Sequence, residues 1–345
     1  MALLREVDPG EIGLAGRVKP AERRPPRYAL FDPAGARVEG VPVPGTASRL
    51  AAEGGFFYAD IHAPNEGELE ALRQEFRFHP LAIEDVRTRH QRPKIDVYTD
   101  HYFLVFYRVG AAGGNGEWHL QELDFFIGPN FLVVTHDSEV PLLDAVFERF
   151  CREVGRKDVS SLLYDLLDAI VDDYFLYLDD LGERSQAIDE RIFESFDPKS
   201  LEQILDFKRD LALLRRVVAP GRDAINVLLR RDPPILDTVH VFYFQDVYDH
   251  LIRISDSIDT YRELATGSLD AFLSIQNNRI SEIVRKLTVV SIIFLPITAV
   301  TGFFGMNFAA FEPQPRNQAL FLISLAFIVV VPLVMLGFLR RKGLR

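Results

Sequence analysis

The sequence predicts an α+β cytoplasmic domain, built as an α/β sandwich, followed by a very long stalk helix and a two-helix transmembrane hairpin. Three observations lead to this fold class. Strand-like and helix-like patterns alternate before Cys151, whereas only helical patterns follow it. No proline interrupts the chain between Leu236 and Pro296. Two long runs without any charged side chain lie close to the C-terminal end of the sequence.

Residues 1–155 are predicted to form the α/β domain. Segments rich in aromatic and β-branched residues, bounded by turn residues, are typical of strands. Segments with apolar residues at helical spacing are typical of helices. The strands are expected at 28–32, 56–62, 101–109, 123–128 and 130–136, with a turn at 110–117, and the helices at 65–76 and 79–86.

Residues 156–235 are predicted to form an acidic helical hairpin. Pro220-Gly221 and the Asp-Pro-Pro sequence at 232–234 are expected to interrupt its helical pattern. Acidic side chains crowd the first helix, which is typical of a solvated face. They could alternatively keep the helix mobile or attract cations. These residues are Asp165, Asp168, Asp172, Asp173, Asp179, Asp180 and Glu183.

A single continuous helix is expected from about residue 236 to 304, with residues 236–286 as a cytoplasmic stalk. At 1.5 Å per residue its length would be on the order of 100 Å. Gly267 should weaken this helix only slightly. The helix is therefore long enough to cross a membrane and extend far into the cytosol.

Residues 287–304 and 319–339 are the predicted membrane spans, because each is long enough for a bilayer and lacks Asp, Glu, Lys and Arg. The alternative is a pair of buried helices in a soluble protein. Pro296 and Pro332 should bend the spans without ending them. Basic residues precede the first span and fill the tail at 340–345, so both termini are expected in the cytoplasm of an inner-membrane protein. The loop at 305–318 would then face the other side.

A heptad stripe of small, hydroxyl and amide side chains follows the long helix into the first span; we call it the polar seam. Since two spans cannot enclose water, such a seam predicts several chains around a hydrated path, with Val284, Leu287 and Leu295 as apolar constrictions. Dry helix packing is the alternative. The polar seam comprises Asp270, Ser274, Asn277, Ser281, Val284, Thr288, Ser291, Leu295, Thr298, Gly302 and Gly305.

The sequence Gly305-Met306-Asn307 ends the polar seam at the predicted outer mouth. The side-chain carbonyl of Asn307 and nearby backbone carbonyls would form a ring of neutral oxygens. No carboxylate lies between Glu282 and Glu312, so a naked cation would not be held tightly. Such acceptors suit a small divalent ion that keeps its water, as Mg²⁺ does. Helix capping is the alternative role for Gly305 and Asn307.

Composition and motifs exclude several other functions. The net charge of −11 disfavours nucleic-acid binding, and the single Cys151 excludes an internal disulfide. No common hydrolase, phosphate-binding or nucleophile motif is found, so we expect no enzyme activity and no organic cofactor. Two alternatives remain: a metallohydrolase site at His79, Asp85 and His90, and a membrane-anchored scaffold or signalling protein without ion flux.

With these features together, the sequence resembles the CorA family of magnesium transporters. The resemblance covers most of the chain, and it is densest from residue 243 to the end. It implies a funnel-shaped homopentamer in the lipid bilayer, whose first membrane helix lines the pore and whose Gly-Met-Asn ring selects the ion. Phe304 replaces the family's usual tyrosine, and Ser281 stands where the family commonly has asparagine.

The resemblance also implies a regulatory Mg²⁺ site between neighbouring subunits. The segments around Asp85 and Asp246 resemble the family's facing segments, and Glu84 and Asp249 could assist. Bound Mg²⁺ would remove carboxylate repulsion and close the pore. The expected activity is passive Mg²⁺ uptake down its electrochemical gradient, with Co²⁺, Ni²⁺ or Zn²⁺ as alternative cargo.

Overall fold

The computed structural model describes residues 24–38, 45–111, 118–153, 157–194, 197, 199–230, 240–305 and 318–341. By its internal contacts the chain divides into two compact units, Met1–Ser268 and Leu269–Arg345. The first unit contains a sheet and its covering helices, and the second contains apolar helical segments. Each unit is described by itself.

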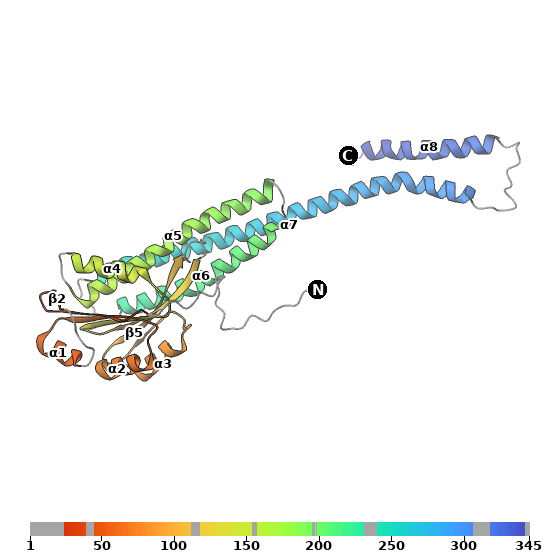
Figure 1. Cartoon of the computed structure of the whole chain (residues 1–345). Helices are drawn as coiled ribbons and strands as arrows, with labels where there is room; N and C mark the ends of the chain where they lie inside the picture. The colour runs from red at the N-terminus through yellow and green to blue at the C-terminus, as the bar shows by residue number, and fades with distance from the viewer. Residues whose placement is uncertain are drawn as a thin grey trace. The chain divides into compact units, whose positions relative to one another are not determined.

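A seven-stranded sheet in the order β2-β1-β3-β7-β6-β5-β4 forms the centre of the first unit (Figure 1). All neighbouring strands are antiparallel except β3 and β7, which are parallel. The strands are β1 (Arg27–Phe31), β2 (Arg37–Val38), β3 (Phe56–His62), β4 (Lys94–Val97), β5 (Tyr102–Ala111), β6 (Trp118–Ile127) and β7 (Phe131–His136).

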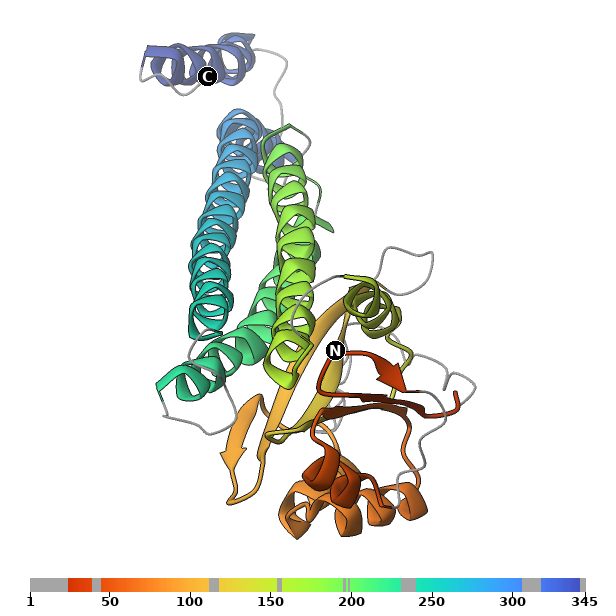
Figure 2. The same ribbon diagram turned by 90° about the vertical axis from the view of Figure 1, so that its left-hand side faces the viewer.

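Helices cover both faces of this sheet, as Figures 1 and 2 show. One face carries α1 (Thr46–Glu53), α2 (Glu66–Phe76) and α3 (Pro80–Thr88). The other carries α4 (Pro141–Arg152), α5 (Val159–Glu194) and α6 (Lys199–Arg230). Because β3 leads to α2 and β7 leads to α4, the two parallel strands send the chain to opposite faces. The predicted α/β sandwich is confirmed.

Aromatic side chains fill the two layers between sheet and helices. Phe78 stacks on Phe126 of β6 on one face, with ring centroids 4.0 Å apart. Tyr58 of β3 stacks on Phe147 of α4 on the other, at 4.6 Å. All four side chains are buried, and burying one such ring contributes about 2 kcal/mol. These contacts fix the helices on their respective faces.

Local sequence explains where α2 and α3 begin and end. Asn65 forms a capping box with Glu68, which satisfies two backbone donors at the start of α2. The imidazole of His79 accepts the Leu81 backbone N–H before α3, which then begins at Pro80. α3 ends at Thr88, and its C-cap residue Arg89 has a positive φ of 53°.

The predicted interruption at Pro220-Gly221 is wrong, because α6 continues through both residues. Proline removes one backbone donor and normally bends a helix. Here the missing Cβ of Gly221 lets the ring of Phe106 lie against α6, since an added Cβ would be 3.1 Å from that ring. Packing against β5 therefore outweighs the local helix-breaking preference. The sequence also missed β2, β4, α1 and most of α4.

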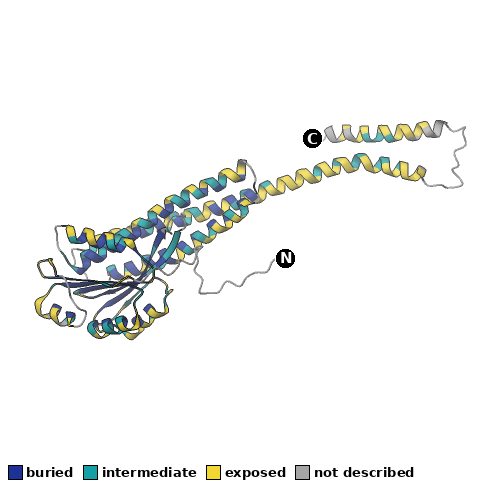
Figure 3. Cartoon of the chain, in the orientation of Figure 1, coloured by how far each residue is buried: buried dark blue, intermediate teal, exposed yellow. Residues whose placement is uncertain are grey.

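Two further helices complete the chain. α7 (Val241–Gly305) confirms the long continuous helix and contains Pro296, and α8 (Gln318–Arg341) covers the second predicted span. Among the residues that the structure describes, α7 alone contains an apolar stretch long enough to cross a membrane, and Leu325–Met335 is a shorter one. Figure 3 shows that side chains in the C-terminal part of α7 are mostly exposed. The predicted turn at 110–117, the Asp-Pro-Pro sequence at 232–234 and the loop at 305–318 lie largely outside the described residues.

Candidate functional site

The polar seam lies on one exposed face of α7. All of its residues, from Asp270 to Gly305, are exposed in the single chain. The less exposed side chains of the first predicted span form a different stripe, and none of them belongs to the polar seam. That stripe comprises Val289, Ile292, Ile293, Pro296, Ile297 and Val300. The polar seam is therefore a face that no described residue of its own chain covers.

The threonine hydroxyls of the polar seam are oriented by their own helix. Thr288 Oγ1 donates to the carbonyl of Val284 at 2.8 Å, and Thr298 Oγ1 donates to that of Phe294 at 2.9 Å. Each hydroxyl proton is therefore engaged, and the oxygen lone pairs remain as acceptors. The water shell of a cation presents hydrogens outward, so these oxygens are suited to bind hydrated ions.

Apolar positions alternate with these acceptors. The side chains of Val284, Leu287 and Leu295 are 54%, 64% and 69% exposed. Across a closed ring of helices such side chains would form constrictions that exclude water. Just before the first predicted span, Glu282 pairs with Lys286 at 2.8 Å, and the hydrogen bond from Lys286 lowers the Glu282 pKa.

The glycines of the polar seam pack against no described part of the chain. A Cβ added to Gly302 or to Gly305 would meet nothing within 4 Å. Glycine inside a helix costs about 1 kcal/mol relative to alanine, so a close approach by another backbone or by an ion would explain both residues. Met306 and Asn307, the remaining filter residues of the prediction, lie outside the described residues.

A second group of predicted residues lies on α3. Asp85 pairs with Lys94 of β4 at 2.7 Å, and the same ammonium reaches Asp96 at 2.7 Å. Asp85 and Glu84 line a surface hollow of about 490 Å³ together with these groups. Within the single chain, Lys94 therefore partly neutralises Asp85.

Asp246 and Asp249 lie near the start of α7. Asp249 accepts a hydrogen bond from Gln245 at 3.0 Å, and Asp246 lies 3.8 Å from the imidazole of His250. The side chain of Asp246 is 53% exposed. The group of close ligand atoms found among the described residues includes neither Asp85 nor these two acids.

A cluster of three potential metal ligands lies beside Asp246. Ligand atoms of Asp168, Asp172 and His250 all lie within 4.8 Å of one another. Burial and the neighbouring Asp172 carboxylate raise the Asp168 pKa, because both disfavour its charged form. The two acids were recognised in the sequence only as part of an acidic helix. His250 was missed, since 78 residues of chain separate it from Asp172 and only the fold brings them together.

The metallohydrolase alternative finds no support among the described residues. The ring of His79 accepts the Leu81 N–H and stacks on Tyr98 at 4.4 Å. His90 lies beyond the end of α3, where its φ is 58°. The structure does not bring these imidazoles and Asp85 into a common group of ligand atoms.

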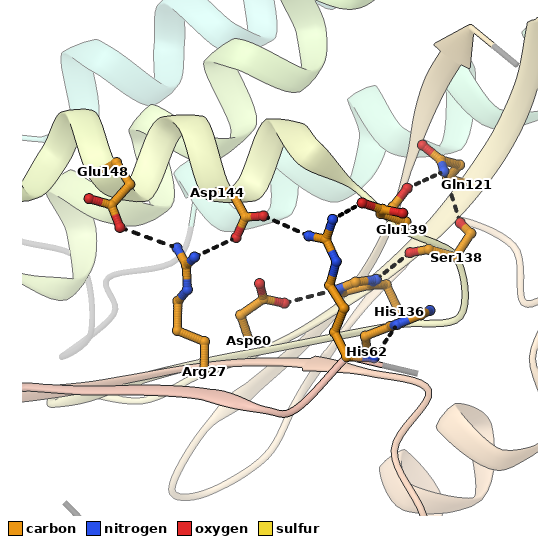
Figure 4. A network of polar contacts seen from close by, with 10 residues as sticks. Arg27, Asp60, His62, Gln121, His136, Ser138, Glu139, Asp144 and Glu148 are labelled. Carbon is orange, nitrogen blue, oxygen red and sulfur yellow. Dashed lines mark hydrogen bonds and ion pairs between the residues drawn. The ribbon is translucent and has the colours of Figure 1, made fainter. Parts of the chain in front are cut away.

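A polar network that the sequence did not predict lies at the carboxyl ends of β3 and β7 (Figure 4). His136 contacts Asp60 at 2.8 Å and the carbonyl of Ser138 at 2.5 Å through its two ring nitrogens. His62 stacks on His136 with ring centroids 5.4 Å apart. Arg27 pairs with Asp144 of α4 at 2.9 Å and thereby ties β1 to that helix. The Ser138 hydroxyl accepts from Gln121, and the network anchors α4 to the sheet through Asp144.

Comparisons with known proteins identify the family. The model of the CorA-like Mg²⁺ transporter protein family matches residues 53–341. The chain belongs to this family. CorA of Thermotoga maritima, a cobalt/magnesium transport protein, is 31% identical to it over 277 residues, covering 79% of each chain. A putative metal ion transporter of Bacillus subtilis is 30% identical over 290 residues, or 84% of this chain and 89% of that protein.

The fold agrees with this family assignment. The complete structure of the CorA magnesium transporter from Methanocaldococcus jannaschii matches with a TM-score of 0.77 and 22% identity, covering 92% of this chain and 98% of that one. The resemblance found in the sequence is confirmed, and so is the predicted fold class. Membership of a transporter family agrees with the expectation that the chain is not an enzyme.

Proposed function

We propose that this chain is one subunit of a homopentameric channel that carries Mg²⁺ into the cell down its electrochemical gradient. The exposed polar seam of α7 is the observation that carries this proposal. Several copies of the seam, facing a common axis, would line a hydrated path. The names of the relatives, a cobalt/magnesium transport protein among them, support Mg²⁺ and make Co²⁺ the second candidate cargo.

The ion would pass the seam with its water shell. Asn307, with Gly305 and Met306, would bind the hydrated ion at the outer entrance through carbonyl oxygens. The hydroxyls of Thr298, Ser291 and Thr288 would then accept hydrogen bonds from the ion's water in turn.

The path narrows where apolar side chains alternate with these acceptors, and it then reaches the cytoplasm. The apolar side chains of Leu295, Leu287 and Val284 would form the gate, where a dry ring stops an ion. Ser281, Asn277 and Ser274 continue the polar path below it. Asp270 would attract cations at the inner end. An inside-negative potential supplies about 2.3 kcal/mol per charge per 100 mV, so no ATP is required.

Mg²⁺ bound between cytoplasmic domains would close the pore. Asp85, with Glu84, would face Asp246, with Asp249, of a neighbouring subunit. Lys94 already partly neutralises Asp85, so the remaining repulsion arises mainly around Asp246. Asp168, Asp172 and His250 add negative charge and ligands there, which supports a cation at this place. A bound divalent ion would hold adjacent subunits together and stop the helices from separating.

The same proposal places the protein in the inner membrane with both termini in the cytoplasm. Its partners are lipid, divalent cations and further copies of the chain, with no nucleic acid. The segments at 287–304 and 319–339 would be the two spans, with 305–318 outside. The α/β domain would end at residue 155, the acidic hairpin at residue 235 and the stalk at residue 286.

The decisive experiment is Mg²⁺ flux into liposomes that contain the full chain. Asn307→Ala should reduce flux at least tenfold because the entrance loses its acceptor ring. Asn317→Ala, in the same loop but outside the Gly-Met-Asn sequence, is the matched control and should conduct like the native protein. Equal flux through Asn307→Ala would refute the entrance assignment. If the native protein conducts no Mg²⁺, the scaffold alternative is favoured. Parallel assays with Co²⁺, Ni²⁺ and Zn²⁺ would show which of these ions the protein transports fastest.

A further inference from the structure

A lysine side chain lies between the acids of the surface hollow at α3. The ammonium of Lys94 donates to Asp85 Oδ2 at 2.7 Å and reaches Asp96 Oδ2 at 2.7 Å, so one cation bridges two carboxylates. Glu84 lines the same hollow of about 490 Å³. Among the described residues that line it, three are acids and Lys94 is the one base. The hollow therefore keeps an excess of negative charge even with its lysine in place.

The sheet fixes Lys94 at a place from which its side chain reaches both acids. Lys94 and Asp96 are two residues apart on β4, so their side chains leave the same face of that strand. β4 is held by its pairing with β5, in which Lys94 lies opposite Val105. Asp85 comes to the same place from α3. The ammonium is thus tethered beside both carboxylates and can shift from one to the other without leaving the hollow.

The contact between Lys94 and Asp85 can be broken by an ion from solution. The side chains of Lys94, Asp85 and Asp96 are 35%, 21% and 36% exposed, and ion pairs that water reaches are only weakly stable. A divalent ion carries twice the charge of the ammonium, and its attraction to a carboxylate is stronger in proportion. If such an ion takes Asp85, the ammonium keeps its contact with Asp96. The exchange therefore leaves neither the lysine nor Asp85 without a partner.

We propose that Lys94 is a built-in competitor of the regulatory cation, whose ammonium occupies Asp85 until a divalent ion displaces it toward Asp96. This inference rests on the proposed regulatory Mg²⁺ site at Asp85. Because every ion that binds must first break the contact between Lys94 and Asp85, the lysine raises the Mg²⁺ concentration at which the site fills. A monovalent ion brings no more charge than the ammonium it would replace, so the lysine also favours divalent ions at this place.

The test is calorimetric titration of the full chain in detergent with MgCl₂, in which the heat that Asp85→Asn abolishes defines binding at the regulatory site. Lys94→Gln should bind Mg²⁺ there about tenfold more tightly, the change expected when a positive charge beside an ionic site is removed. Weaker or unchanged binding would overturn the inference, because a lysine that only orients Asp85 would give that result. Lys94→Arg keeps the charge and offers a fork that fits a carboxylate, so it should bind Mg²⁺ no more tightly than the native protein.

Asp96 tests whether the ammonium shifts between the two acids. Asp96→Asn removes the second partner of the ammonium, so Lys94 should hold Asp85 more firmly and Mg²⁺ should bind about tenfold more weakly. The double variant Lys94→Gln/Asp96→Asn should bind as tightly as Lys94→Gln alone, because Asp96 would act only through the lysine. If the double variant instead loses the same factor of ten relative to Lys94→Gln, Asp96 acts on the ion directly and the proposed exchange is wrong.

A matched control separates a local effect from a general one. Arg87→Gln removes a positive charge from α3, but Arg87 pairs with Glu66, and neither is among the described residues that line the hollow. This variant should bind Mg²⁺ like the native protein, and a tenfold gain would overturn the inference by showing that any nearby positive charge has the same effect.

The thermal unfolding midpoint without Mg²⁺ shows whether each variant is folded, and its rise with MgCl₂ gives a second measure of affinity. Lys94→Met, which keeps the length of the side chain, replaces Lys94→Gln if the latter folds poorly. If Asp85→Asn binds Mg²⁺ with the same heat as the native protein, the regulatory site and this inference both fail. If Asp85→Asn abolishes part of the heat but neither neutral variant of Lys94 binds more tightly, this inference alone fails.

Discussion

Individual polar side chains in this protein are held by partners that belong to other elements. His136 presents both ring nitrogens to oxygens, one from the Asp60 carboxylate and one from the Ser138 carbonyl. A carbonyl can only accept, so the Ser138 side of the ring must carry a proton. The other ring nitrogen faces the Asp60 carboxylate at 2.8 Å. Both side chains are nearly buried, at 5% and 13% exposure.

Asp60→Asn should therefore destabilise the cytoplasmic unit by about 3 kcal/mol, because it leaves the buried imidazole without its anion. The measurement is the urea midpoint of the full chain in detergent, followed by far-ultraviolet circular dichroism. Asp206→Asn is the control, since Asp206 pairs with Arg209 on the surface of α6 with 53% of its side chain exposed. Its midpoint should stay within about 0.5 kcal/mol of the native value. A similar small effect for Asp60→Asn would show that the His136 pair is not an ion pair.

Whole elements were predictable from the sequence where one pattern dominates. The strands β3, β5, β6 and β7 are rich in aromatic and β-branched residues, and α7 has helical spacing without a central break. β2 has two residues and β4 has four, which is too short for a periodic signal. α6 passes through Pro220 because tertiary packing on Phe106 outweighs local preference. Distant residues such as Asp172 and His250 share no local pattern, so their cluster required the fold.

The polar seam of α7 gives a prediction for one of its apolar positions. Leu295→Thr should increase Mg²⁺ flux severalfold, because a hydroxyl replaces a side chain that keeps the proposed constriction dry. Val290→Thr is the matched control, since Val290 is 50% exposed on the same helix but lies off the seam. Its flux should equal that of the native protein in the same liposome assay. If the two variants conduct alike, the seam does not face the ion path.

At the scale of the whole molecule, the proposed closure would depend on charges that different subunits contribute. Asp85 of one copy and Asp246 of the next would share one ion, so the loss of either carboxylate removes the same site. Among the described residues, Asp85 pairs with Lys94, and Asp246 lies near His250 and Asp168. Because both carboxylates would bind the same ion, the effects of substituting Asp85 and Asp246 on inhibition by Mg²⁺ should not add.

Asp85→Asn and Asp246→Asn should each raise the internal Mg²⁺ concentration that half-inhibits flux by about tenfold, the cost of one lost charge contact. The double variant should be little worse than either single variant, because the shared ion is already lost. Asp223→Asn is the control, since Asp223 pairs with Arg222 on the surface of α6 and should leave inhibition unchanged. The measurement is Mg²⁺ efflux from preloaded liposomes over a range of Mg²⁺ concentrations on the cytoplasmic side. Additive effects of the two substitutions would mean two independent sites, and closure would then not require an ion held between subunits.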